Sequence, residues 1–321
     1  MTNPNAKNPY RIPVLQIDAV TGQWTSDNPT EGGIDPKKGE LLSLANANSK
    51  LKALRKTVSA KLNVPIAKVK ILTLTLPAGW SCPGASECLA FADPVTGKVW
   101  DSPELKFRCF EASAERYPDV RRQNWHNFNL LRRLNSKYSG GYSFGAMIFD
   151  SIKEATKNFK PDDVVIIRIH VGGDFYSTKY LEGWAIALRA TRLPQNEPMP
   201  MIIGYAYTKS IHHIAKLNLE MPENFVLTAS EGGKFDALIE SLPGLKKAKV
   251  VFSPEQAESE GLEIDHDDSH AVFGKESFGL LIHGTQPKGT DSAKALSSLK
   301  ARGIQSGYSE KAMKDYRNSI S

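Results

Sequence analysis

Short apolar runs, rich in β-branched residues, alternate along the chain with segments of helical periodicity. Each run is apolar at consecutive positions, which indicates strands that are buried on both faces of a sheet. Between most runs, apolar residues recur three or four positions apart, as in Tyr180, Leu181, Trp184 and Leu188, which is typical of amphipathic helices. The expected strands cover residues 69–76, 164–171, 201–206, 225–229, 249–252 and 278–283.

This alternation predicts an α/β fold with a mainly parallel sheet. Strand, helix and strand joined by right-handed crossovers give parallel pairing, and about six such units suit either a (β/α) barrel or an open doubly wound sheet. We expect a partial or complete TIM-like barrel over residues 49–321, beginning with a helix that contains Leu51, Leu54 and Val58. Residues 1–48, rich in Asn, Gly, Pro, Thr and Asp, are expected to form an N-terminal arm.

Polar or small residues follow the carboxyl end of every expected strand. In barrels and open parallel sheets alike, ligands bind at those ends. A single polar residue there could simply cap a helix, but six such ends on one edge favour a shared pocket. The residues expected to act there as catalytic groups are Lys209, Glu231 and His283.

The three cysteines of the chain lie close together in sequence, directly after the first expected strand. Five residues separate Cys82 from Cys88, and twenty separate Cys88 from Cys109. The alternative is that Cys109, between Phe107 and Phe110, is a small buried apolar residue. Three thiolates without a fourth ligand suit a metal centre with an open position, and soft thiolates select zinc or an iron–sulfur cluster. The spacing matches no standard zinc pattern.

Other candidate ligands leave alternatives open. A fourth ligand could come from His126, His170 or His283. Residues 265–270, with the sequence Asp-His-Asp-Asp-Ser-His, could hold a divalent cation, although a solvated acidic loop is the more common interpretation. The pair Gly172 and Gly173 lacks the full glycine fingerprint of a nucleotide site, but it would let the backbone approach a ligand closely.

Composition and charge narrow the class of protein. Hydrophobic residues make up 40% of the 321 residues, enough for a sizeable core, and no apolar run approaches the ~18 residues that would span a bilayer. The polar N-terminus and three cysteines favour a cytoplasmic protein without a disulfide framework. The net charge is +6, so the basic clusters favour a nucleic acid or nucleotide partner, with a solvated helix face as the alternative. The clusters are Lys50, Lys52, Arg55, Lys56 and Lys61, and Arg121, Arg122, Arg132, Arg133 and Lys137.

Three motifs carry a resemblance to a known family. Residues 76–85 (LPAGWSCPGA), 173–177 (GDFYS) and 205–209 (YAYTK) resemble the phage "gene product 88" family, over about residues 41–309. More distantly, the layout resembles radical S-adenosylmethionine enzymes, which hold an iron–sulfur cluster on three cysteines after the first strand of a partial barrel. That resemblance implies a [4Fe-4S] cluster on the three cysteines. It also implies contacts to S-adenosylmethionine from Gly172, Gly173 and Asp174, with Tyr176 in the same motif.

The chain departs from the radical enzymes in two respects. Those enzymes have three and two residues between their cysteines, and they have Glu where this chain has Asp174. The leading hypothesis is nevertheless a radical S-adenosylmethionine-like phage enzyme of the host cytoplasm. One alternative is a non-catalytic phage protein, stapled by zinc or an iron–sulfur cluster, that binds nucleic acid or a host protein. Another is a metal-dependent hydrolase that uses residues 265–270.

Overall fold

The computed structural model describes residues 15–17, 24–26, 39–47, 51–137, 140–195, 198–304 and 306. Most of the expected arm at residues 1–48 lies outside these ranges. Its described parts include the antiparallel pair β1 (Leu15–Ile17) and β2 (Trp24–Ser26), and β3 (Ala45–Asn46), which joins the main sheet.

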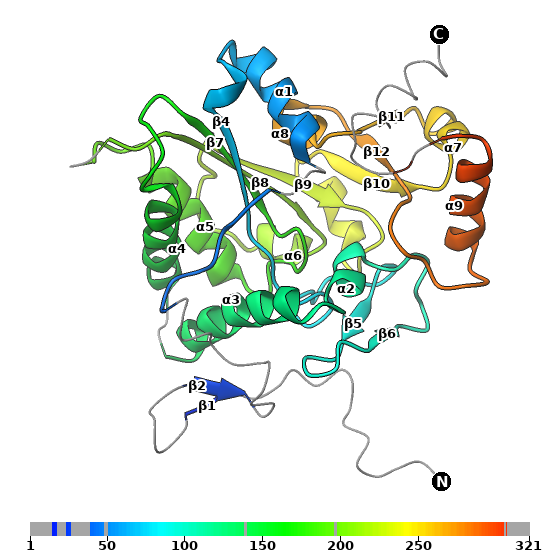
Figure 1. Cartoon of the computed structure of the whole chain (residues 1–321), viewed down its shortest axis with the longest axis horizontal. Coiled ribbons are helices and arrows are strands. Elements are labelled where there is room, and N and C mark those ends of the chain that lie inside the picture. The colour runs from blue at the N-terminus through cyan, green and yellow to red at the C-terminus, as the bar shows by residue number, and fades with distance from the viewer. Residues whose placement is uncertain are drawn as a thin grey trace.

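An eight-stranded sheet forms the centre of the molecule (Figure 1). Its strand order is β11-β12-β10-β9-β8-β7-β4-β3, and every neighbouring pair is parallel except the antiparallel pair of β3 and β4. All six expected strands are present and lie side by side in chain order. They are β4 (Val69–Thr73), β7 (Val164–Ile169), β8 (Met201–Thr208), β9 (Phe225–Ser230), β10 (Lys247–Val251) and β12 (Phe278–Leu281).

The sheet is open, so the expectation of a complete barrel is wrong. Closure requires the two edge strands to pair with each other. Here β3 and β11 (Glu263–Ile264) are the edges, and no pairing joins them among the described residues. Both edge strands are two residues long, and β3 runs antiparallel to its neighbour.

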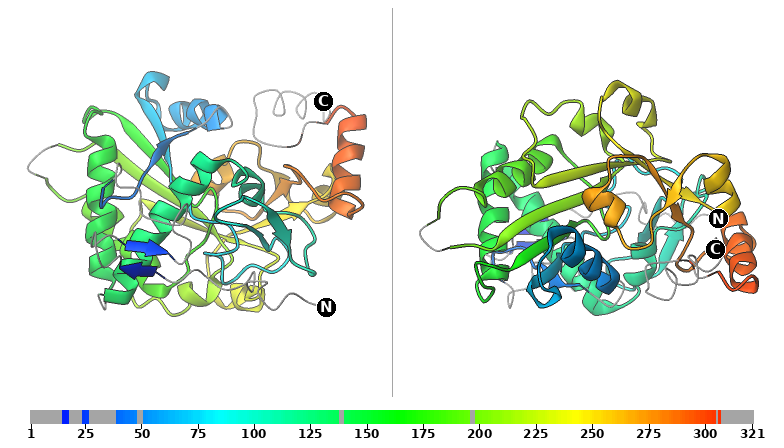
Figure 2. Two further views of the ribbon diagram at one scale, coloured as in Figure 1. Left: turned by 60° about the horizontal axis from the view of Figure 1, so that its bottom comes forward. Right: turned by 90° about the horizontal axis from the view of Figure 1, so that it is seen from above.

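Helices cover the sheet on both sides (Figures 1 and 2). The expected helices are confirmed, but α6 is a single turn and the segment after β9 is a 3-10 helix, η3 (Asp236–Ser241). None of the described helices is both long and apolar enough to cross a bilayer. The helices are α1 (Lys52–Leu62), α2 (Phe110–Ala114), α3 (Pro118–Lys137), α4 (Gly141–Thr156), α5 (Thr178–Ala190), α6 (Ile211–Ile214), α7 (Pro254–Ser259), α8 (Ser269–Phe273) and α9 (Asp291–Ala301), with a 3-10 turn, η2 (Ile66–Lys68).

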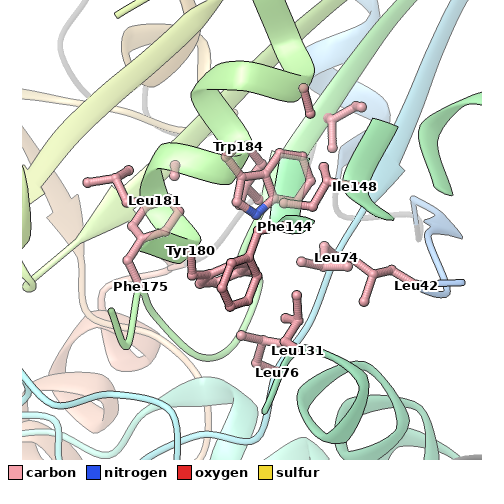
Figure 3. Close-up of a cluster of buried hydrophobic side chains, with 14 of the residues drawn as sticks. Leu42, Leu74, Leu76, Leu131, Phe144, Ile148, Phe175, Tyr180, Leu181 and Trp184 are labelled. Carbon is pink, nitrogen blue, oxygen red and sulfur yellow. The ribbon is translucent and has the colours of Figure 1, made fainter. Parts of the chain in front are cut away.

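The largest apolar core lies between one face of the sheet and helices α3, α4 and α5 (Figure 3). Ser177 caps α5 by accepting a hydrogen bond from the backbone N–H of Tyr180, and the buried face of the helix then presents Leu181 and Trp184. Helices α4 and α5 pack closely because Gly183 has no side chain, since a Cβ there would lie 2.4 Å from the Cβ of Phe144.

The alternation of side chains along β7 determines which residues face the other side of the sheet. Val165, Ile167 and Ile169 belong to the core with α4 and α5, whereas Val164 and Ile166 pack in a second core with α1 and α8. Because successive side chains point to opposite faces, Arg168 extends the second row towards the carboxyl end of the strand. A charged residue thus follows the apolar row, next to the edge where a site is expected.

A long connection between β4 and β7 was not anticipated from the apolar pattern. It contains the antiparallel hairpin of β5 (Ala90–Ala92) and β6 (Val99–Asp101), followed by α2 and α3. The connection packs across the carboxyl ends of the strands, through backbone hydrogen bonds such as Leu76 N–H to the carbonyl of Gly172 (2.9 Å). It carries all three cysteines.

Candidate functional site

A cavity of about 190 Å³ lies at the carboxyl edge of the sheet. It brings together most of the residues expected from the sequence, from the connection after β4 and from the ends of β7, β8 and β12. Those in its lining are Cys82, Cys88, Cys109, Gly172, Gly173, Asp174, Lys209 and His283. We call this cavity the cysteine pocket.

The loop that carries Cys82 and Cys88 is fastened to the neighbouring strand ends by its backbone. The N–H of Lys234 donates to the carbonyl of Gly84 (2.9 Å), and the N–H of Glu87 donates to the carbonyl of Gly232 (3.1 Å). Gly84 is required at this contact, because a Cβ there would lie 2.3 Å from the carbonyl oxygen of Lys209. The loop is therefore held against the ends of β8 and β9.

Cys109 reaches the same cavity from the other side, although twenty residues separate it from Cys88. It lies directly before α2. The preceding residue, Arg108, donates its backbone N–H to the side-chain oxygen of Gln286 (2.7 Å), and its guanidinium Nε donates to Asp101 (2.7 Å). These contacts fix the approach of Cys109 to the end of β12, which Gln286 follows.

The three thiols influence one another electrostatically. Burial is the main cause that raises the pKa of each thiol, and it raises the pKa of Cys109 to about 12. Asp174, Cys109 and Cys88 raise the pKa of Cys82 further, in that order, whereas Lys209 lowers that of Cys88. The thiols are consequently neutral near pH 7, and a bound cation would be needed to favour three thiolates here.

The donor set, three thiols on one cavity, fits a soft metal centre in kind. Thiolates ligate a single zinc ion at ~2.3 Å, so their sulfurs would lie roughly 4 Å apart. Within the described ranges, no three His, Cys, Asp or Glu side chains are grouped so as to hold one metal ion. In a cubane cluster each cysteine binds a different iron, so its three sulfurs do not converge on one point.

Gly172 and Gly173 line the cavity, but the space that their missing side chains leave is filled by protein. A Cβ on Gly172 would lie 1.9 Å from Cγ of Glu111, and one on Gly173 would lie 2.5 Å from Cβ of Leu76. Gly173 also has a φ of +87°, in the left-handed region that favours glycine. The packing of the connection after β4 thus explains both glycines, where the sequence had suggested the approach of a ligand.

Asp174 and Lys209 connect neighbouring strand ends within the pocket. The buried carboxylate of Asp174 accepts hydrogen bonds from Thr208 Oγ1 (2.6 Å) and from the backbone N–H of Lys209 (2.9 Å), and burial raises its pKa. The ammonium of Lys209 donates to the carbonyl oxygens of Ser230 and Glu231. A chain of hydrogen bonds therefore joins the ends of β7, β8 and β9.

Two of the expected site residues do not reach this cavity. The carboxylate of Glu231 lies 3.7 Å from the ammonium of Lys247, and the ring of Tyr176 stacks on that of Tyr180 with centroids 5.1 Å apart. Neither side chain is in the lining. The expected assignments of Glu231 to catalysis and Tyr176 to cofactor binding thus receive no support from their positions.

The three histidines proposed as a fourth ligand have different surroundings. His126 bonds through Nε2 to the carbonyl of Leu41 (3.0 Å), and it does not line the pocket. His170 lines it, bonds through Nε2 to the hydroxyl of Tyr180 (2.9 Å), and has its pKa lowered by burial to about 3. Its Nδ1 is buried and has no hydrogen-bond partner among the described residues. His170 is thus neutral in the pocket. His283 also lines the pocket and bonds through Nδ1 to the carbonyl of Leu281 (3.1 Å).

Comparison with known proteins relates the chain to one family. The family model described as "Gene product 88" matches residues 42–303. The chain belongs to the gene product 88 family. The matched range contains every residue that lines the cysteine pocket. No curated protein and no solved structure matches the chain, and the more distant resemblance to radical S-adenosylmethionine enzymes stays a prediction.

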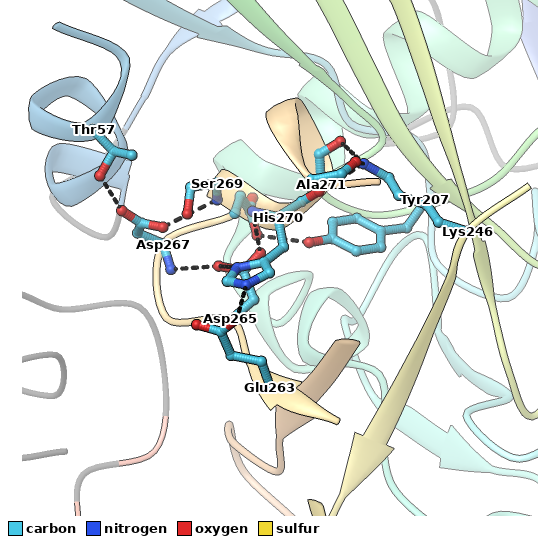
Figure 4. Close-up of polar contacts among 11 residues, drawn as sticks. Thr57, Tyr207, Lys246, Glu263, Asp265, Asp267, Ser269, His270 and Ala271 are labelled. Atoms are coloured by element: carbon cyan, nitrogen blue, oxygen red, sulfur yellow. Dashed lines mark hydrogen bonds and ion pairs between the residues drawn. The ribbon is translucent and has the colours of Figure 1, made fainter. Parts of the chain in front are cut away.

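Residues 265–270 of this gene product 88 protein are an internal support of the fold (Figure 4). Thr57 on α1 donates to Asp267 (2.6 Å), and Asp265 accepts from the backbone N–H groups of Asp267 (3.1 Å) and His270 (3.2 Å). The three aspartates are buried, so the interpretation as a solvated loop is wrong. Their carboxylates are occupied by protein donors, which gives no support to a hydrolytic metal site.

A polar network on the second face of the sheet was missed from the sequence. Asp268 is fully buried and accepts hydrogen bonds from the hydroxyls of Tyr205 (2.6 Å) and Tyr207 (3.0 Å), and it pairs with Arg168 (2.7 Å). Arg168 also lines the cysteine pocket and a neighbouring cavity. The sequence did contain a signal for this network. Arg168 is the one charged residue of β7, at a position where the apolar run predicts a buried side chain.

Proposed function

We propose that the cysteine pocket binds a [4Fe-4S] cluster and that this gene product 88 protein is a radical S-adenosylmethionine-like enzyme. One observation carries the proposal: all three cysteines of the chain line a single cavity at the carboxyl edge of a parallel sheet, beside Gly172 and Gly173. The strand order supports it, because parallel strands that follow one another in space and in sequence are what a partial (β/α) barrel requires.

The electrostatics of the pocket agree with this assignment. The surroundings raise the pKa of all three half-buried thiols, and neighbouring thiols contribute to this at Cys82 and Cys109. Such thiols bind a cationic centre in preference to protons only when the centre is a strong soft acid, as iron–sulfur clusters and zinc are. Lys209 adds positive charge next to Cys88, where it favours the thiolate. Lys209 would thus stabilise the cluster-bound form.

The residues of the chain have separate tasks in this proposal. Cys82, Cys88 and Cys109 would hold the cluster, which when bound would supply one electron to the sulfonium of S-adenosylmethionine. Asp174 holds the end of β8 in place through Lys209, and so positions the ammonium beside the thiols. The lining is largely apolar, which would limit the access of water to reactive species.

Metal analysis tests this proposal. Protein purified without oxygen should be brown and contain about four irons and four sulfides per chain. Each of Cys82→Ala, Cys88→Ala and Cys109→Ala should lose most of this iron, because each removes one of only three ligands. Ser86→Ala is the matched control, since Ser86 lies in the same loop and contacts Glu104 rather than the pocket.

Other outcomes would separate the alternatives. A colourless protein that contains zinc would favour the metal-stapled binding protein, and a protein without metal would refute both. If iron is present, addition of S-adenosylmethionine should change the electron paramagnetic resonance spectrum of the reduced cluster. An unchanged spectrum would leave a cluster protein without this cofactor.

A further inference from the structure

A basic groove lies at the opposite end of the same strands, between α1, the start of β4 and the loop before β7. Its volume is about 680 Å³. Asp163 is the one acidic residue among the side chains that line it, and Asp163 accepts a hydrogen bond from the backbone N–H of Lys160 (2.9 Å). The basic residues in the lining are Lys52, Arg55, Lys68, Lys70 and Lys160.

The cations of this groove differ in how far the fold uses them. Arg55 donates to the carbonyls of Val69 (3.0 Å) and Ile66 (3.1 Å), and Lys68 pairs with Asp162. Lys52 and Lys160, by contrast, have exposed side chains on the two sides of the groove. These two lysines are the charges that a ligand would meet first.

The second basic cluster of the sequence has a different role. Arg121 is buried and donates to the carbonyls of Glu115 (2.8 Å) and Val95 (3.0 Å), and Arg122 pairs with Asp119. Arg133 pairs with Glu40. The fold thus uses these three arginines in contacts of its own, so the groove is the better candidate for an anionic partner.

The groove also contains an aromatic ring. Phe159 is half-buried in the lining, and the ammonium of Lys70 lies 6.0 Å from the centre of its ring. A positively charged groove with an exposed aromatic face is typical of surfaces that bind single-stranded nucleic acid, where phosphates are neutralised and bases stack. An acidic protein partner would have no comparable need for the ring.

Shared lining residues connect the groove with the cysteine pocket. A third cavity, of about 340 Å³, lies between them, and we call it the chamber. Asn46 and Leu51 line both the groove and the chamber. The chamber and the cysteine pocket share Phe110, Arg168, Val171 and His283.

The lining of the chamber suits a nucleobase. Its volume is at the low end of the ~300–1,000 Å³ of small-molecule sites, so it has room for one nucleotide but not for duplex. Side-chain amides and hydroxyls line it, together with the guanidinium of Arg168, and these groups bind the edges of unpaired bases. They are Asn46, Thr73, Thr75, Gln123 and Asn124.

We infer that the protein binds single-stranded nucleic acid, with the phosphates in the basic groove and one base in the chamber. A base placed there would lie next to Arg168 and His283, at the mouth of the cysteine pocket. Binding in the groove stands independently of the cluster. The further assignment, that the base bound in the chamber is the substrate of the enzyme, rests on the proposed function.

Fluorescence anisotropy of the full-length chain with a labelled single-stranded DNA of about 12 nucleotides tests the groove. The double variant Lys52→Glu/Lys160→Glu should weaken binding at least tenfold in about 0.1 M salt, and it should reduce the salt slope by about 1.4, at about 0.7 per phosphate contact. The matched control is Lys288→Glu/Lys300→Glu, which makes the same change in charge at exposed positions outside the groove. The control should bind with little change.

Several results would overturn the inference. An equal loss of affinity in both double variants would indicate attraction to net charge alone. Duplex DNA or polyglutamate that competes as well as the single strand would indicate a different partner. Crosslinks from a photoreactive thymine should map to residues 107–124 or 168–171, and crosslinks confined to α1 and residues 158–160 would exclude the chamber.

The cysteine variants separate this inference from the proposed function. Cys82→Ala should lose iron but keep the affinity for the oligonucleotide, because Cys82 lies outside the groove and the chamber. Lys52→Glu/Lys160→Glu should lose affinity but keep iron. A wild type that lacks iron but binds the oligonucleotide would refute only the cluster. A wild type that contains iron but does not bind the oligonucleotide would refute only the nucleic acid partner.

Discussion

At the scale of single residues, the site is built from groups whose first task is to hold the chain together. Asp174 accepts three hydrogen bonds, from Thr208 and from the backbone N–H groups of Phe175 and Lys209. Gly173 allows the segment after β7 to pack against Leu76 and Ser81, because these two side chains fill the space that a Cβ on Gly173 would need. Positions that resemble cofactor contacts in sequence can therefore be explained by packing alone.

This explanation predicts the effect of Gly173→Ala. A Cβ would lie 2.5 Å from that of Leu76, in a backbone conformation that disfavours side chains, so the free energy of unfolding should fall by about 2–4 kcal/mol. Urea unfolding measures this change. Gly289→Ala is the control, because Gly289 has a similar φ of +84° but an added Cβ would meet no described atom within 4 Å beyond its chain neighbours. This variant should lose only about 1 kcal/mol. Equal losses in the two variants would show that the contact with Leu76 is unimportant.

At the scale of elements, short segments at both ends of the sheet are fixed by polar contacts. Residues 265–270 join α1 to the second face of the sheet, through Thr57 on α1 and the contacts of Asp268 with Tyr205, Tyr207 and Arg168. Within this segment, His270 pairs with Glu263 (3.1 Å) and Asp265 (3.5 Å). The ammonium of Lys246 binds the carbonyls of His270 and Ala271 (both 2.6 Å) at the end of α8. Stability should consequently depend on the charge of His270.

The pH dependence follows from the pKa of His270, which the nearby carboxylates of Asp265 (3.5 Å) and Glu263 (3.1 Å) raise to about 9. The pKa of His270 in the unfolded chain is about 6.5, so the charged imidazolium stabilises the fold. This stabilisation is fully present below about pH 6.5. This stabilisation should be lost as the pH rises through about 9. Urea midpoints of wild type and His270→Gln, compared from pH 6 to about 10, should therefore converge at high pH.

The difference between wild type and His270→Gln isolates the contribution of His270 to stability from those of other titratable groups. Burial lowers the pKa of Lys246 to about 8, so Lys246 favours folding more as the pH rises. This opposite contribution is present in both proteins and is removed by taking the difference. A difference between wild type and variant that stays constant from pH 6 to 10 would contradict the assigned pKa.

At the scale of the whole molecule, the cysteine pocket depends on contacts between distant parts of the chain. Gln286 and Arg108 are 178 residues apart, and their hydrogen bonds hold Cys109 near the end of β12. The Cys82 loop is attached to residues 232–234 after β9. A ligand that binds all three cysteines would add a further link between these regions.

Cluster binding should therefore stabilise the entire fold. A ligand present at 100 times its dissociation constant adds about 2.7 kcal/mol, so the cluster-loaded protein should unfold about 5 °C or more above the cluster-free protein. Anaerobic calorimetry before and after reconstitution with iron and sulfide measures the difference. Cys109→Ala should show no increase, whereas Ser86→Ala should behave as wild type. Equal melting temperatures of the loaded and cluster-free wild type would mean that iron binds outside the pocket.

The sequence by itself determined the sheet and the edge where a site is possible. Continuous apolar runs require burial on both faces, and helices between them require parallel strands, so all six strands were predicted with ends correct to within a few residues. The polar residues after those runs then had to gather at one edge. Lys209, His283 and the three cysteines follow from this rule.

The tertiary structure alone decided which of these residues share a cavity and whether the sheet closes. Local periodicity carries no information on hydrogen bonds between residues 178 positions apart, such as those that bring Cys109 to the pocket. Beyond the end of a strand, the backbone conformation of the loop determines where a side chain points. Glu231 therefore faces Lys247, and Tyr176 stacks on Tyr180. Closure depends on which strands lie at the edges of the sheet. The apolar pattern did not indicate that β3, a two-residue strand, would pair antiparallel with β4 at one edge, because pairing between strands is a tertiary contact.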